Sequence, residues 1–261
     1  MGKDKQITRY SNDLNTVPMR KWTAEEQDFF FAIATQARGQ GTKLLKFEKE
    51  QLIRLANYSL EHNQRFYTTI ENLANKLTSM RYYERTPRSF VVINLFQRFE
   101  TVWNDDLTEM YALVRVSEDY EYVLNKLESQ FTQFELKQFT NIRSTYAKEM
   151  FKKLKQWRMV GKKEYPIDEF RTMLEIPKSY PNAEINRRVI TPILDELTQY
   201  FKGLKVKTIK SNKRGNPIIA YEFTWKPEKV DKWINDKYEN ISDKEPYLKP
   251  KNWLDGSFTS L

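Results

Sequence analysis

The stretch that decides the expected fold runs from Tyr180 to Phe201 and reads YPNAEINRRVITPILDELTQYF. At about 100° per residue its apolar side chains share one half of a helical cylinder. They are Ile185, Val189, Ile190, Ile193, Leu194, Leu197, Tyr200 and Phe201. The other half carries polar residues, among them Glu184, Arg187, Arg188 and Thr191. The pattern predicts an amphipathic helix whose arginine pair is either solvated or available to a partner.

Two residues of this stretch carry further expectations. Asn182 is well placed to cap the start of the helix. Pro192 lies in the helix interior, where a proline costs about 3 kcal/mol and leaves the carbonyl of Arg188 without its amide partner. We therefore expect a bend at Pro192 that lets the N-terminal half of the helix tilt into a groove.

The net charge of +9 is concentrated in one segment of the chain. Residues 137–228 hold 20 Lys or Arg against 10 Asp or Glu, whereas residues 1–136 hold 18 against 19 and residues 229–261 hold 6 against 6. A basic segment favours a polyanionic partner, because each lysine or arginine that meets a phosphate releases counterions. Nucleic acid and an anionic membrane surface both fit this charge.

Length and composition exclude several classes of protein. A chain of 261 residues suits one large domain or two small ones. The absence of cysteine excludes a disulfide scaffold and a thiolate zinc site, and it fits a reducing cytosol. The sequence has neither a run of about 18 apolar residues nor the apolar core of a secretory signal. We therefore expect a soluble, cytoplasmic protein without a membrane span, and the turn-broken basic pattern disfavours a membrane partner.

The order of predicted elements occurs twice along the chain. The first half gives a helix that begins with a Thr23 to Glu26 capping box, and then a strand, two helices and further strands, at residues 21–37, 43–48, 49–59, 62–80, 80–85, 89–96 and 109–116. The second half gives a helix, a short strand, two helices and a strand pair, at residues 144–157, 162–167, 168–176, 180–201, 203–210 and 218–225. This order is typical of a winged helix-turn-helix module. The sequence thus predicts an α+β fold of two tandem winged helix-turn-helix domains related as a pseudo-repeat.

The same reading divides the chain into five parts. Residues 1–9 form a flexible N-terminus, 10–118 the first winged-helix domain, 119–136 a connecting helix, 137–226 the second winged-helix domain and 227–261 a polar tail. Because the charge surplus falls in the second of these domains, that domain is expected to contact the polyanion.

The predicted helix of residues 180–201 has the properties of a recognition helix in the second domain. It follows a helix and a tight turn, and its first turns would enter the major groove, where arginine can bond guanine. The candidate residues on it are Asn182, Glu184, Arg187, Arg188 and Thr191. The strand-pair loop SNKRGNP is interpreted as a wing that meets phosphate or the minor groove, and its charge comes from Lys210, Lys213 and Arg214.

Other basic residues are weaker candidates. Lys148, Lys152 and Lys155 recur at helical spacing, which fits either a stripe that follows the phosphate backbone or a solvated helix face. Arg65, in the first domain, is a further candidate for a backbone contact.

Two segments resemble the Rep_3 type of plasmid replication initiators, especially those of theta-replicating plasmids of low-GC Gram-positive bacteria. They are YSNDLNTVPMRKWTAEEQDFFFAI at 10–33 and AEINRRVITPILDELTQY at 183–200, and the resemblance covers roughly residues 8–226. It implies two winged-helix domains that bind direct repeats, called iterons, at the plasmid origin. The second domain would read the iteron in the major groove, through the five recognition-helix candidates and with Lys213 and Arg214 as the wing.

The resemblance also implies partners and assembly states. The first domain would contact the DNA backbone and contribute to dimerisation. Monomers would initiate replication, and homodimers would bind the operator and repress the initiator's own gene. The host replication initiator and the replicative helicase would be recruited to the origin.

The sequence gives no sign of an enzyme. A rolling-circle initiator needs a pair of metal-binding histidines, and this chain has His62 alone. A phosphate-binding GxxxxGK[ST] loop is also absent. We therefore expect no catalytic activity, no cofactor and no metal. The alternatives to an initiator are a transcriptional regulator of the same architecture and, less favoured, a basic protein at the membrane surface.

Overall fold

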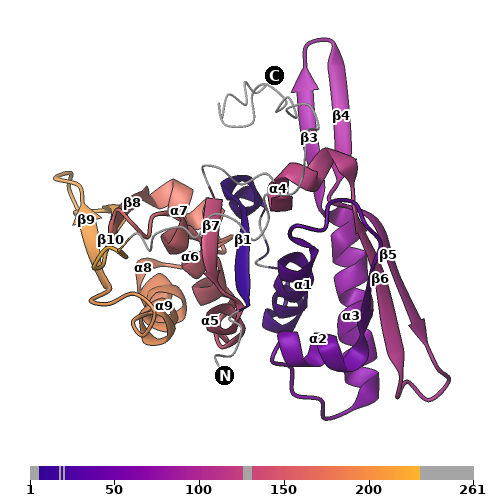
Figure 1. Cartoon of the computed structure of the whole chain (residues 1–261). Coiled ribbons are helices and arrows are strands. Elements are labelled where there is room, and N and C mark those ends of the chain that lie inside the picture. Colours follow the sequence, from indigo (N-terminus) through magenta and orange to yellow (C-terminus); the bar gives the residue numbers. More distant parts are fainter. Residues whose placement is uncertain (1–5, 18, 20, 126–130, 230–261) are drawn as a thin grey trace. The chain divides into compact units, whose positions relative to one another are not determined.

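The computed structural model describes residues 6–17, 19, 21–125 and 131–229 (Figure 1). The predicted polar tail, 227–261, lies outside the described residues from residue 230 onward, and so do residues 1–5 of the predicted flexible N-terminus. Among the helices that are described, none is both long enough and apolar enough to span a bilayer.

The first domain is built from three helices and a three-stranded antiparallel sheet. Its elements are α1 (Ala24–Ala37), β2 (Leu45–Glu48), α2 (Lys49–Leu55), α3 (Asn63–Ser79), β5 (Phe96–Trp103) and β6 (Met110–Val116), with strand order β2-β6-β5. The predicted capping box starts α1, since the Thr23 side chain accepts from the Glu26 amide and the Glu26 carboxylate accepts from the Thr23 amide. Phe29 and Phe66 pack edge to face between α1 and α3 in the core.

The second domain repeats this arrangement. Its elements are α6 (Thr145–Gln156), β8 (Lys162–Pro166), α7 (Ile167–Met173), α8 (Asn182–Ile185), η3 (Asn186–Ile190), α9 (Thr191–Leu197), β9 (Lys205–Lys210) and β10 (Ile218–Thr224). The strand order β8-β10-β9 places the third strand in the centre, as in the first domain. The prediction of an α+β fold with two winged-helix domains is therefore confirmed.

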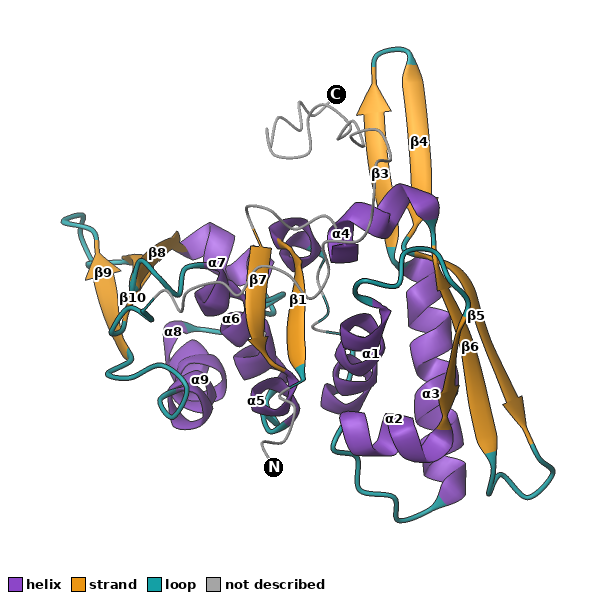
Figure 2. Ribbon diagram, in the orientation of Figure 1, coloured by secondary structure: helices purple, strands orange, loops and turns teal. Residues whose placement is uncertain are grey.

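A hairpin that the second domain lacks is inserted into the first. Strands β3 (Arg81–Thr86) and β4 (Ser89–Asn94) pair antiparallel with each other and form a separate two-stranded sheet, which Figure 2 draws apart from β5 and β6. The sequence pattern predicted too few strands in this region, because it left residues 97–103 of β5 unassigned. The wing of the first domain is the β5–β6 hairpin.

The prediction of one connecting helix over residues 119–136 was wrong for the part that the structure describes, and residues 126–130 lie outside that part. The segment holds the 3-10 turn η2 (Glu118–Tyr120), the short helix α4 (Glu121–Asn125) and strand β7 (Phe131–Glu135), and α5 (Leu136–Thr140) begins at its end. In β7 the sequence FTQFE alternates, so that Thr132 and Phe134 are buried. Alternation favours a strand here once a partner strand is available.

That partner strand corrects a second prediction. Strand β1 (Ile7–Ser11) pairs antiparallel with β7, in a register that sets Ile7 opposite Glu135 and Ser11 opposite Phe131. Residues 7–9 are therefore part of a sheet, not of a flexible terminus. Arg9, which is almost buried, lies over the Phe131 ring at 3.7 Å from its centroid. The 3-10 turn η1 (Asn12–Thr16) then leads from β1 toward α1.

An aromatic cluster packs α6 against α1 of the first domain and against the end of α9. Phe134 of β7 contacts Phe31 of α1, and it also contacts Phe151 of α6 at a centroid distance of 5.1 Å. Phe151 in turn contacts Phe201, just beyond α9, at 5.7 Å. The buried side of α6 thus faces the first domain and the end of α9 at the same time.

Candidate nucleic-acid interface

The predicted recognition helix is present as α8, η3 and α9, and these three elements are called the recognition helix below. Ile185, Val189, Ile190, Ile193 and Leu197 are buried, as the period predicted. Asn182, Arg187, Arg188 and Thr191 are exposed, and Glu184 is partly exposed. The helix therefore buries its apolar stripe and presents all five candidate residues at the surface.

The start of the recognition helix differs from the prediction. Asn182 is not the N-cap, because the helix begins at Asn182 and Pro181 occupies the cap position. The first intrahelical bond runs from the Ile185 amide to the Pro181 carbonyl at 3.0 Å. Pro181 suits the N-cap position because its extended backbone ends the preceding turn before the helix begins. The Asn182 side chain makes no capping bond and is left at the surface.

Pro192 is accommodated by a change of helix type. Residues Asn186–Ile190 form a π-helical turn, in which the Thr191 amide donates to the Asn186 carbonyl five residues earlier. The α-helix resumes at Thr191 with Pro192 in its first turn, where the N–H that proline lacks is not required for an α-helical hydrogen bond. A π turn, which inserts one residue into the helix, therefore lies immediately before the proline. The bend predicted at Pro192 stays a prediction.

The two arginines of the recognition helix share one carboxylate. Arg187 donates through Nη2 to both Glu184 oxygens at 2.9 and 3.0 Å, and Arg188 donates through Nε to Oε2. The hydrogen bonds from Arg187 and then Arg188 lower the pKa of Glu184. Half or more of each arginine side chain stays exposed, at 65% and 51%. Glu184 therefore orients both guanidinium groups while their outer edges remain accessible.

Arg171 is a residue that the sequence reasoning missed. It lies in α7 and donates to the Tyr180 carbonyl at 2.8 Å and to the Pro177 carbonyl at 3.4 Å, both in the turn before the recognition helix. Tyr180 in turn lies under the Arg188 guanidinium at 5.6 Å. Arg171 thus braces the helix-turn-helix connection, and local spacing gave no signal for these backbone contacts.

The wing connects β9 to β10 through residues 211–217. The Ser211 amide donates to the Pro217 carbonyl at 2.8 Å, and the Asn216 amide donates to the Lys213 carbonyl at 2.9 Å. Gly215 and Asn216 close the loop with φ of 85° and 43°. Lys210, Lys213 and Arg214 are all exposed, as are two lysines of β9 that the sequence analysis had not singled out, Lys205 and Lys207.

The structure contradicts both readings of Lys148, Lys152 and Lys155. They are 0%, 1% and 5% exposed, so they form neither a phosphate-tracking stripe nor a solvated face. Each is paired with a carboxylate, from Asp28, Glu149 and Glu228 respectively. The helical spacing was right, but it marks the buried face of α6, and buried lysines are retained only when a carboxylate compensates them.

The Lys148 to Asp28 pair joins α6 to α1. Lys148 Nζ donates to Asp28 Oδ1 at 2.5 Å and to the Phe139 carbonyl at 2.8 Å, and it lies 4.1 Å from the Phe139 ring centroid. Burial lowers the pKa of Lys148. Burial also raises the pKa of Asp28 to about 7, against the attraction of Lys148.

Arg65 lies at the surface of α3 and is half exposed. Its guanidinium donates to Glu25 at 2.5 Å and lies 3.7 Å from Glu61. Two carboxylates therefore compete with any phosphate for this side chain. Its role as a backbone contact stays a prediction.

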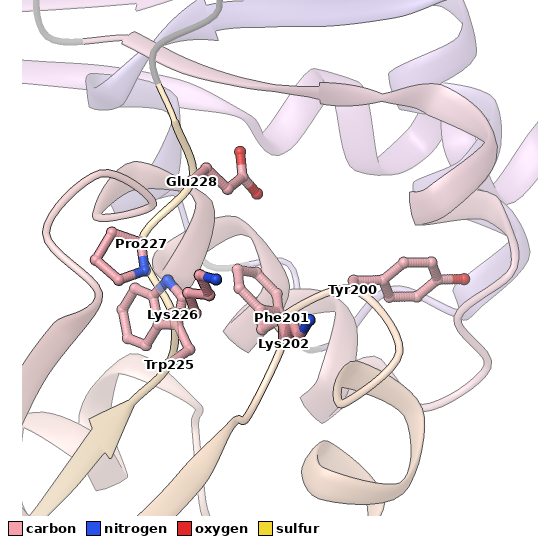
Figure 3. Close-up of a pocket in the computed structure, with 7 residues that line it drawn as sticks. All are labelled: Tyr200, Phe201, Lys202, Trp225, Lys226, Pro227 and Glu228. Atoms are coloured by element: carbon pink, nitrogen blue, oxygen red, sulfur yellow. The ribbon is translucent and has the colours of Figure 1, made fainter.

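A cavity of about 240 Å³ lies where the chain leaves β10 (Figure 3). Rings and lysines line it, and the lining contains no histidine or cysteine and no nucleophile beside a base. Its lining residues are Tyr200, Phe201, Lys202, Trp225, Lys226, Pro227 and Glu228. Within the described part of the chain, no three His, Asp or Glu side chains come together in a group that could hold a metal ion.

The topology and the site define a protein of two winged-helix domains, the second of which presents a basic recognition helix and wing. The chain belongs to the family of initiator replication proteins. The family model described as "Initiator Replication protein, WH1" matches residues 7–155, and "Initiator Rep protein, WH2" matches residues 166–225.

Two further proteins are similar to the chain. A "Probable replication protein rep" of Bifidobacterium longum (strain NCC 2705) is 31% identical over 226 residues, which cover 85% of this chain and 73% of that protein. The crystal structure of Pi initiator protein in complex with iteron DNA matches with a TM-score of 0.64 at 14% identity, over 85% of this chain and 98% of that chain. At this identity the structural match supports the fold.

Proposed function

We propose that the chain initiates plasmid replication by binding direct repeats, or iterons, at the plasmid origin. The observation that carries the proposal is the exposed Arg187 and Arg188 pair on a helix that buries Ile185, Val189, Ile190, Ile193 and Leu197 on its other face. Membership of the initiator family gives this surface its biological context. The Pi initiator, which has the same fold, was crystallised with iteron DNA, and this supports the choice of ligand.

In this proposal the recognition helix enters the major groove and reads the repeat. Arginine bonds guanine O6 and N7 in bidentate fashion, and each such contact discriminates against the wrong base by about 1–3 kcal/mol. Asn182 and Thr191 lie on the same exposed face and add polar groups. Glu184 holds the two arginines in the unbound protein and is able to accept from a cytosine amino group in the complex.

The wing and the neighbouring strand supply contacts that do not depend on sequence. Lys205, Lys207 and Lys210 lie on the edge strand β9, and Lys213 and Arg214 lie at the wing. These exposed charges meet phosphates, which fixes the orientation of the domain on the duplex. Each phosphate contact adds about one counterion to the salt dependence of binding.

The first domain has a different role in the proposal. Its charge is nearly neutral, and its exposed Arg65 is already engaged by Glu25 and Glu61. It contacts the DNA backbone weakly and contributes to self-association. Monomers act at the origin with the host initiator and the replicative helicase, and dimers repress expression of the chain's own gene.

Purified protein tests the proposal in a competition assay. At physiological salt we expect a duplex with the origin repeat to bind at least about a thousandfold more tightly than a scrambled duplex of equal length. Equal affinities would exclude sequence-specific recognition.

A minimal plasmid separates an initiator from a transcriptional regulator of the same fold. We expect the reading frame and its repeats alone to sustain plasmid replication. Repeat binding that changes expression but does not sustain the plasmid would favour the regulator.

A further inference from the structure

Glu196 of α9 closes the start of α6. Its Oε2 accepts from the Arg143 amide at 2.5 Å, and its Oε1 accepts from the Ser144 amide at 2.9 Å. Ser144 is the N-cap of α6 and accepts from the Ala147 amide. The first amides of a helix have no intrahelical partner, and the helix dipole favours a negative charge beside them. The recognition helix is thus tied through one carboxylate to the beginning of α6.

One turn further along, α6 is tied to the first domain. Lys148 donates to Asp28 of α1 at 2.5 Å, across 120 positions in the sequence. Asp28 and Glu196 both favour the charged form of Lys148 and so oppose the effect of burial on its pKa. Lys153, on the next turn, donates to the Asn15 carbonyl of η1 at 2.6 Å. A continuous chain of polar contacts therefore runs from the recognition helix through α6 to α1 and η1.

We propose that Glu196 is a positioning residue that holds the recognition helix in a fixed relation to the first domain, so that both domains meet one repeat in register. This inference rests on the proposed function, because it matters only if both domains touch the same DNA. Glu196 itself need not contact DNA, since its carboxylate is occupied by the amides of α6. Its effect is expected where the first domain contacts the repeat.

The test compares Glu196→Gln with Asp195→Asn in the full chain. Both variants lose one negative charge at neighbouring positions of α9, but Asp195 is exposed and Glu196 is partly buried against α6. The glutamine oxygen can accept from only one of the two backbone N–H groups, and the glutamine NH2 group, which is itself a donor, would face the other. Each variant is titrated with the full repeat and with a repeat truncated on the side that the first domain protects in the wild-type footprint.

We expect Glu196→Gln to bind the full repeat about tenfold more weakly and the truncated repeat within about twofold of wild type, since the lost carboxylate bonds act through the placement of the first domain. Asp195→Asn is expected to match wild type on both duplexes. Equal losses of Glu196→Gln on both duplexes would overturn the inference, and so would wild-type behaviour on both.

A second variant keeps the inference testable if Glu196→Gln folds poorly. Lys153→Met removes the bond to the Asn15 carbonyl of η1 without leaving a buried charge unpaired, and it is expected to weaken binding of the full repeat selectively. Wild-type affinity of Lys153→Met for the full repeat would overturn the inference. Failure of the proposed function gives a different result, because wild-type protein would then not distinguish the repeat from scrambled DNA.

Discussion

Replacing Lys148 by methionine tests the energetics of the buried face of α6. The substitution keeps an unbranched side chain of similar length but removes the bonds to Asp28 Oδ1 and to the Phe139 carbonyl. Asp28, whose side chain is 10% exposed, then keeps its carboxylate without a buried partner. Breaking a buried pair by removing one partner costs about 3–5 kcal/mol. Against a typical unfolding free energy of about 5–15 kcal/mol, this loss is large.

The loss of unfolding free energy in Lys148→Met should increase as pH rises. The pKa of Asp28 is raised from 3.8 to about 7 in the folded wild-type chain, and it rises further without Lys148, because the attraction and hydrogen bond of Lys148 lower it. A carboxyl that holds its proton more tightly when folded makes the unfolding free energy fall as pH rises from the unfolded to the folded pKa, by about 1.4 kcal/mol per pH unit at most. In wild type, the fall in unfolding free energy caused by Asp28 therefore levels off within about one pH unit above pH 7, whereas in Lys148→Met it continues at pH 8.

Urea unfolding at pH 5, 7 and 8 measures this difference. The matched control is the double variant Lys148→Met with Asp28→Leu, which removes both charges and should recover most of the lost stability and the wild-type slope above pH 7. If Lys148→Met loses less than about 1 kcal/mol at pH 8, or if the double variant is no more stable than the single one, the account of this pair is refuted.

Two further predictions concern the second domain. Glu184→Gln releases Arg187 and Arg188 from their shared carboxylate, so the affinity for scrambled DNA should rise several-fold and the salt dependence of binding should steepen by about one counterion. Titrations at several salt concentrations measure both quantities, and an unchanged salt dependence would contradict the pairing. Gly161→Ala should destabilise the chain by more than about 3 kcal/mol, because φ is 73° and an added Cβ would lie 2.6 Å from the Trp225 carbonyl oxygen and from the Pro227 ring. Gly215→Ala, where φ is 85° and no atom lies near the added Cβ, should cost only about 1–2 kcal/mol. Thermal unfolding compares the two variants, and equal losses of stability would refute the steric argument.

Local patterns were sufficient for the buried stripe and the exposed arginines of the recognition helix. The 3.6-residue period identified Ile185, Val189, Ile193 and Leu197 as buried, and it left Arg187 and Arg188 on the outside. The Glu184 pairing with both arginines follows from three- and four-residue spacing and could have been predicted. Secondary structure and exposure of this kind depend on near neighbours in the sequence.

The features that sequence reasoning missed depend on distant partners. Strand β1 forms only because β7 lies beside it, and their residues are more than 100 positions apart. The lysines of α6 have the spacing of a solvated stripe, and Lys148 and Lys155 can be buried only because Asp28 and Glu228 pair with them. No window around Lys148 contains this information, because the compensating charge belongs to α1.

The central claim is that the recognition helix reads sequence while the wing binds phosphate. Equilibrium titration of Arg188→Ala and Lys213→Ala against the origin repeat and a scrambled duplex tests it most directly. We predict that Arg188→Ala weakens binding to the repeat by about 1–3 kcal/mol more than binding to the scrambled duplex. Lys213→Ala is expected to weaken binding to both duplexes alike and to lower the salt slope by about one. If both variants weakened binding to both duplexes equally, that division of roles would be contradicted.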